Sequence, residues 1–98
     1  MERTYRDKRE VKKRVYRLIK QRFFSYTSKQ PDLSKKVDLI NLICHYKKKL
    51  EPKKYKLDGD IFLALGKMVA LLKDGSRAVP LDFRYELESL EQQLDIAV

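Results

Sequence analysis

The 98-residue sequence contains one cysteine, no tryptophan, three glycines and three prolines. A single thiol cannot form a disulfide within the chain, which excludes a disulfide-stapled scaffold and makes a reducing cytoplasm the expected location. So few glycines and prolines also exclude a loop-rich or disordered protein. With 43% apolar and 38% charged residues, the composition favours a helical domain.

Long apolar runs are missing as well. The strongest extends from residue 61 to residue 72 and is interrupted by Lys67, whereas a helix that spans a bilayer needs about 20 apolar residues. We therefore expect a buried core helix here and not a membrane span. The first ten residues contain no apolar stretch, so we expect no signal peptide.

Residues suited to catalysis or metal binding are scarce. The only histidine, His45, follows the only cysteine, Cys44, and neighbours on a helix point about 100° apart, so they do not form a catalytic pair. We expect Cys44 to be a small buried thiol. One cysteine and one histidine are too few ligands for a zinc site. Asp58 and Asp60 resemble the start of a calcium loop, but apolar residues stand at its fifth, sixth and twelfth positions: Phe62, Leu63 and Val69. The sequence thus predicts no enzyme, no metal and no cofactor.

Positive charge is concentrated in the first half of the chain. Residues 1–24 carry ten Lys/Arg and three Asp/Glu, residues 25–56 carry nine and three, and residues 57–98 carry four and eight. The formal net charge of +9 is therefore made by a strongly basic first half and a mildly acidic second half. The basic first half suggests an anionic partner, namely nucleic acid, membrane lipid or an acidic protein surface. The alternative is that the charge only keeps the surface well solvated.

Hydrophobic periodicity predicts four helices at approximately residues 5–24, 33–51, 60–73 and 81–95. The apolar stripes are Val11, Val15, Leu18, Ile19 and Phe23 in the first helix; Val37, Ile40, Ile43 and Leu50, widened by Leu39, Leu42 and Tyr46, in the second; and Phe83, Leu87, Leu90 and Leu94 in the fourth. The third helix is apolar on nearly every side and is expected to lie centrally. Similar lengths and short connections favour an all-α, antiparallel four-helix bundle, with residues 1–98 as one domain.

Residues that start and stop helices agree with these boundaries. The candidate N-terminal caps, in helix order, are Thr4 with Asp7, Asp32 or Ser34, and Asp58 or Asp60, while Pro80 precedes the fourth helix. Three lysines, residues 47–49, complement the dipole at the end of the second helix, which Pro52 terminates. Gly75 is expected to end the third helix.

The segment between the second and third helices carries a family resemblance. It contains Lys49-Leu50-Glu51, then Lys54-Tyr55, then Leu57-Asp58, followed by the apolar helix. This order resembles the centre of the pediocin-like (class IIa) bacteriocin immunity proteins, the enterocin A and mundticin type in particular. The resemblance covers about residues 33–95. The chain differs from that family in Pro52, in its very basic first helix and in having almost no tail after the fourth helix.

The resemblance implies a cytoplasmic protein of a bacteriocin producer. Such proteins engage the mannose phosphotransferase permease with its bound bacteriocin from the inside and prevent lethal leakage, and their C-terminal half largely determines which bacteriocin is resisted. Pediocin-like peptides are typically cationic, as this chain is, so we expect no tight complex with the free bacteriocin. We expect a monomer that acts by stoichiometric binding.

Two sets of candidate contact residues follow. The basic rim comprises Lys47, Lys48, Lys53, Lys54 and Lys56. The candidate specificity residues are Lys73, Ser76 and Arg77 in the connection between the third and fourth helices, and Arg84, Glu88 and Gln92 on the outer face of the fourth. For each position, an exposed polar residue of a soluble bundle is the alternative interpretation.

Other anionic partners stay open. A small nucleic-acid-binding protein is the alternative function, because the basic first helix could follow a phosphate backbone and aromatic residues such as Tyr16 and Phe24 interleave with its charge. The anionic inner leaflet is a further partner. For that contact, we expect the apolar face of the first helix to pack into the bundle and its basic face to remain free for weak, salt-sensitive attraction.

Overall fold

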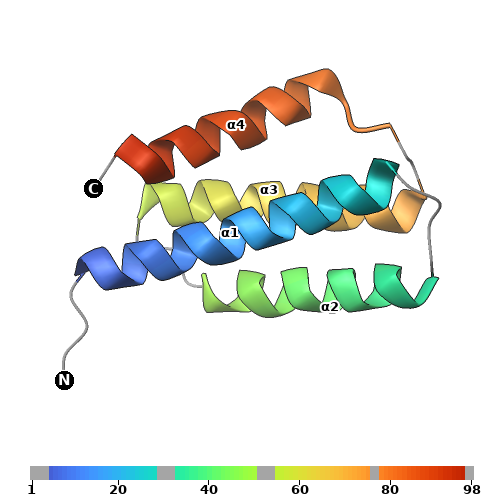
Figure 1. The fold of residues 1–98 in the computed structure, drawn as a ribbon, viewed down its shortest axis with the longest axis horizontal. Coiled ribbons are helices and arrows are strands. Elements are labelled where there is room, and N and C mark those ends of the chain that lie inside the picture. Colours follow the sequence, from blue (N-terminus) through green and yellow to red (C-terminus); the bar gives the residue numbers. More distant parts are fainter. Residues whose placement is uncertain (1–4, 29–32, 51–54, 76–77, 97–98) are drawn as a thin grey trace.

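The computed structural model describes residues 5–28, 33–50, 55–75 and 78–96. It contains four helices, α1 (Tyr5–Ser28), α2 (Leu33–Lys49), α3 (Lys56–Asp74) and α4 (Leu81–Ile96), and the described residues include no strand. The helices lie alongside one another, and α1 and α3 each pack against both α2 and α4 (Figure 1). The all-α class is therefore confirmed. Among the described residues, no helix combines the length and apolarity that crossing a bilayer requires.

Several helix ends differ from the predicted ones. α1 continues to Ser28, where the hydroxyls of Thr27 and Ser28 donate hydrogen bonds of 3.1 and 2.7 Å to the carbonyl oxygen of Phe24. α2 ends at Lys49, and the N–H of Leu50 donates to the carbonyl of Lys47 at 3.0 Å in a closing turn. The candidate caps Thr4 and Asp32 lie outside the described residues, and Ser34 lies within α2, so it is not the cap.

The predicted end of α3 and start of α4 are confirmed. Gly75 adopts a left-handed conformation with φ 77°, and its N–H donates to the carbonyl of Leu72 at 3.3 Å. Glycine takes this conformation without the Cβ penalty that other residues meet. Pro80 directly precedes α4 and accepts a 3.1 Å hydrogen bond from the N–H of Arg84.

The core contains side chains from all four helices. The predicted stripe of α4 is confirmed, because Phe83, Leu87, Leu90 and Leu94 are all buried. α3 provides the largest share, namely Ile61, Ala64, Leu65, Met68, Val69 and Leu72. Leu63 of α3 is nevertheless 64% exposed, so this helix presents one side to solvent and is less enclosed than predicted.

The core-facing side of α1 is rotated relative to the prediction. Val11 and Leu18 are each 43% exposed, whereas Tyr16 is fully buried with Ile19 and Phe23. The phenol of Tyr16 donates a 3.0 Å hydrogen bond to the carbonyl of Leu87 in α4, which gives the buried hydroxyl a partner. Burial raises the pKa of Tyr16 above the usual tyrosine range, and Glu86 adds to the shift. Similar errors occur in α2, where Val37 and Cys44 are exposed and Cys44 is not the buried thiol expected.

Candidate functional site

The corner between α2 and α3 holds most of the predicted basic rim. α2 ends in Lys47, Lys48 and Lys49, as predicted, and Lys56 is the first residue of α3. Lys48 and Lys56 are exposed. Lys53 and Lys54 lie outside the described residues. The rim is thus formed, in the described part of the chain, by cations that end one helix and begin the next.

Lys56 occupies an electrostatically unfavourable position. α3 begins there and not at residue 60, and the residue before it, Tyr55, provides no side-chain cap. The N-terminus of a helix carries partial positive charge, so a lysine in the first turn is disfavoured where an acidic residue would be favoured. The charge of Lys56 therefore has no evident role in stabilising the helix that it starts.

Asp58 is an internal ion-pair partner and not a helix cap, which corrects the predicted role. Its carboxylate is buried, and the Nζ atom of Lys12 in α1 donates to Oδ1 and Oδ2 at 2.7 and 3.0 Å. The same Nζ lies 5.8 Å from the centroid of the Tyr55 ring. The phenol of Tyr46 donates to the backbone carbonyl of Lys12 at 3.3 Å. These contacts attach the corner to α1.

A shallow depression of about 400 Å³ lies beside this corner. It is lined by Cys44, His45, Lys47, Lys48 and Phe62. The Nζ atom of Lys47 lies 4.7 Å from the centroid of the Phe62 ring, a cation–π contact. Lys47 therefore lies across the surface of α3, which leaves Lys48 and Lys56 as the more accessible cations of the rim.

The predicted specificity residues lie apart from this corner. Lys73 is exposed near the end of α3, and Arg84, Glu88 and Gln92 are exposed on α4. The guanidinium of Arg84 stacks over the Phe24 ring of α1 at 5.1 Å, so this arginine is partly engaged within the molecule. Ser76 and Arg77 lie outside the described residues.

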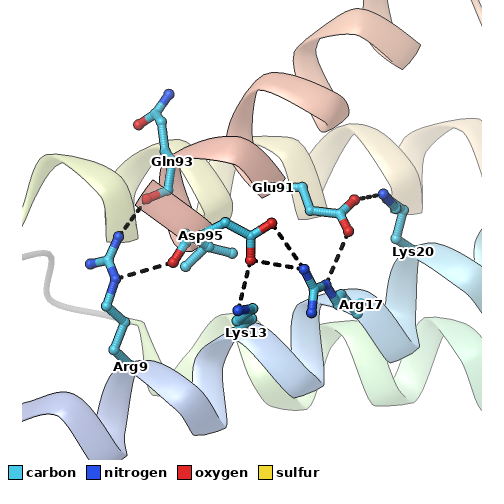
Figure 2. A network of polar contacts seen from close by, with 8 residues as sticks. Arg9, Lys13, Arg17, Lys20, Glu91, Gln93 and Asp95 are labelled. Atoms are coloured by element: carbon cyan, nitrogen blue, oxygen red, sulfur yellow. Dashed lines mark hydrogen bonds and ion pairs between the residues drawn. The ribbon is translucent and has the colours of Figure 1, made fainter. Parts of the chain in front are cut away.

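A second charged region, which the sequence prediction missed, joins α1 to α4 (Figure 2). Arg17 donates to Glu91 at 3.0 Å and to Asp95 at 2.8 Å. Lys13 pairs with Asp95 at 2.7 Å, and Lys20 pairs with Glu91. The four-residue spacing of Lys13 and Arg17, and of Glu91 and Asp95, could have indicated facing stripes of opposite charge.

Arg9 extends this region to the end of α4. Its guanidinium donates to the carbonyl oxygens of Gln93 at 2.6 Å and Leu94 at 3.4 Å. The last carbonyls of a helix have no partner within the helix, so Arg9 acts as a cap supplied by α1. The hydrogen bond from Lys13 lowers the pKa of Asp95, and burial lowers the pKa of Lys20.

These pairs correct the expectation that the basic face of the first helix is free. Four of its cations contact α4, and a fifth, Lys12, contacts α3. Most of the cations of α1 whose side chains the structure describes are therefore engaged within the molecule. Within the described ranges, no group of three or more His, Cys, Asp or Glu side chains could hold a metal ion.

Comparison of the chain with protein-family models, curated proteins and solved structures found no match.

Proposed function

We propose that the four helices form an antiparallel bundle that acts as an immunity protein against a pediocin-like bacteriocin. The protein would bind the complex of bacteriocin and mannose phosphotransferase permease from the cytoplasmic side, as a monomer and without catalysis. The order of the contacts supports the antiparallel arrangement for α1 and α4, since Arg9 contacts Gln93 while Phe23 contacts Phe83.

The observation that carries the proposal is the exposed lysine at the start of α3. Lys56 lies inside the segment that resembles the immunity family, in a position where its charge disfavours the helix. Asp58 of the same segment is accounted for by its pair with Lys12. An exposed cation without such a structural role fits a contact with a partner, and Lys48 lies on the same corner.

Acidic groups on the cytoplasmic surface of the permease complex are the chemistry that this corner would recognise. Lysines at an interface rim contribute through complementary charge, which affects association rate and specificity more than affinity. The exposed residues of α4 would then distinguish between bacteriocin complexes. The alternative partner, nucleic acid, loses support from the α1–α4 pairs, because those cations already have carboxylate partners.

The test is protection of a bacteriocin-sensitive strain that expresses the chain, challenged with a panel of class IIa peptides. Resistance to at least one peptide is expected, and Lys48→Glu/Lys56→Glu should lower it. The matched control is Lys35→Glu/Lys36→Glu, which changes the net charge equally at the start of α2. If no peptide is resisted at equal expression, the immunity proposal is wrong. Binding to DNA or RNA that weakens with added salt would favour the alternative.

A further inference from the structure

Between Val11 and Ser25, one face of α1 points away from the rest of the helices, and its exposed positions include no acidic residue. Six exposed side chains recur at spacings of one, three and four residues and define what we call the outer stripe: Val11, Arg14, Leu18, Gln21, Arg22 and Ser25. On a helix of 3.6 residues per turn these positions fall within one face, opposite the buried Tyr16, Ile19 and Phe23. From the first to the last position, the outer stripe extends about 21 Å.

The arginines of the outer stripe differ from the other cations of α1. Lys12, Lys13, Arg17 and Lys20 all pair with carboxylates of α3 or α4. Neither Arg14 nor Arg22 forms an ion pair with any residue in the described part of the chain. From Arg9 onward, the cations of α1 that lack an ion pair or a backbone acceptor among the described residues are therefore on the outer stripe and not on the side that faces α4.

Exposed aliphatic side chains alternate with these arginines. Val11 and Leu18 keep 43% of their surface exposed, and each has an arginine three or four residues away. An interfacial helix uses this combination, because guanidinium groups bind lipid phosphates while aliphatic side chains enter the boundary between headgroups and acyl chains. A nucleic acid backbone would also attract the arginines, but it offers valine and leucine nothing comparable.

We propose that the outer stripe of α1 is a contact surface for anionic phospholipid, with α1 lying along the membrane surface while its α4-facing cations stay paired. The partner chemistry is a phosphate diester headgroup beside an apolar layer. This contact deepens the membrane association of the proposed function and rests on that function for its place at the inner leaflet. The proposal assigns the attraction to the membrane to Arg14, Arg22, Val11 and Leu18, and not to the whole basic first half of the chain.

The test is co-sedimentation of the full chain with vesicles of phosphatidylglycerol and phosphatidylcholine, compared with phosphatidylcholine alone. Binding is expected only with the anionic lipid and is expected to weaken with salt. Arg14→Glu/Arg22→Glu should lower binding about tenfold or more, since each basic residue near an anionic surface contributes appreciably. Lys48→Glu/Lys56→Glu changes the net charge by the same amount on another surface and should have an effect of about threefold or less.

The aliphatic part has its own control pair. Leu18→Ser should weaken vesicle binding, whereas Leu63→Ser, at a more exposed leucine of α3, should not. Circular dichroism checks that each variant is folded. If Arg14→Glu/Arg22→Glu is not folded, the neutral variant Arg14→Gln/Arg22→Gln is used in its place. Equal losses in the two charge-reversal variants, no effect of either, or no binding by the unaltered chain would overturn the proposal. Arginine-dependent binding to RNA that Leu18→Ser leaves unchanged would assign the stripe to nucleic acid and overturn it too.

These results separate the two proposals. Vesicle binding that depends on the outer stripe, with no protection of sensitive cells, rejects the immunity function and keeps the lipid contact. If the chain protects cells but does not bind anionic vesicles, the lipid contact is rejected and the immunity function is kept.

Discussion

The Nζ atom of Lys12 in α1 lies 2.7 Å from Oδ1 of Asp58 in the first turn of α3, although 46 residues separate the two in the chain. The pair is largely shielded, with 28% of the lysine and 12% of the aspartate side chain exposed. It connects the first helix to the corner that carries the basic rim. The rim therefore has a fixed position relative to α1.

Removing this carboxylate should destabilise the protein. Asp58→Asn leaves the ammonium group of Lys12 without its ion-pair partner in a partly buried site, and we expect a loss of about 1–3 kcal/mol in the free energy of unfolding. Urea denaturation measures it as a lower midpoint with an unchanged slope. Asp38→Asn, at an exposed position of α2, should change the midpoint little. Equal effects of both changes would show that the pair contributes nothing.

Alkaline pH should unfold the protein before its buried phenols ionise. Burial raises the pKa of Tyr16, and it raises that of Tyr46 with a further contribution from Asp58. A raised folded-state pKa means that the stability is fully present below the tyrosine pKa of the unfolded chain, about 10, and is lost as pH rises above it. Absorbance titration of the phenolates should therefore show a second, cooperative phase that coincides with loss of helical circular dichroism.

Tyr16→Phe provides a separate check on that phase. It removes the hydrogen bond to Leu87 and should cost about 0.5–1.5 kcal/mol, and it should reduce the amplitude of the late phase. Tyr85→Phe, at a tyrosine that is 63% exposed, should leave the amplitude of the late phase unchanged. The hypothesis would be rejected if Tyr16 and Tyr46 ionised at the usual tyrosine pKa while the helical circular dichroism persisted.

Acid pH should weaken the attachment of α4 to α1. The hydrogen bond from Lys13 and the charge of Arg17 lower the pKa of Asp95 below its usual value. A lowered folded-state pKa gives stability that is present above the unfolded-chain value, about 3.9, and is lost as pH falls below it. The thermal midpoint should fall over that range, and Asp95→Asn should flatten the fall. Asp74→Asn is the control, because this aspartate is exposed at the end of α3, away from the contacts between α1 and α4, and it should leave the pH dependence unchanged.

Gly66 within α3 and Gly75 at its C-cap should respond with opposite sign to replacement by alanine. Gly75→Ala forces a Cβ into the left-handed region and should destabilise the protein by about 1 kcal/mol. At Gly66 an added Cβ would lie 3.7 Å from Nζ of Lys47, an ordinary contact, so Gly66→Ala should stabilise the helix by up to about 1 kcal/mol. Thermal or urea unfolding of both variants measures the two signs, and equal signs would contradict this account.

The buried residues were predicted best in α4, the helix with a single apolar face. In α4 the apolar residues form one stripe, and Phe83, Leu87, Leu90 and Leu94 are all buried as predicted. In α1 the aliphatic residues occupy two faces, so Val11 and Leu18 compete with Ile19 and Phe23 for the core. Tyr16 determines which face of α1 is buried, because its ring fills the core while its hydroxyl reaches Leu87. Its position among charged residues gave no indication in the sequence that it would be buried.

The partners of charged residues could not be predicted, because they depend on contacts between distant parts of the chain. Asp58 has the residue type and location of a helix cap, and only the packing of α1 against the corner gives it Lys12. Arg17 and Glu91 are 74 residues apart. Composition predicted correctly that the first half is basic, but it could not show that the acidic residues of α4 would neutralise part of that charge.

The pairing between α1 and α4 has a consequence for the order in which the protein is made. A ribosome releases α1 long before it has synthesised Glu91 and Asp95, so the nascent helix spends that interval with Lys13, Arg17 and Lys20 uncompensated and Tyr16 without its acceptor. These native contacts of α1 must therefore wait until α4 has been translated. The docking of α4 then supplies Leu87, Leu90 and Leu94 to the core and carboxylates to the cations of α1 in the same step.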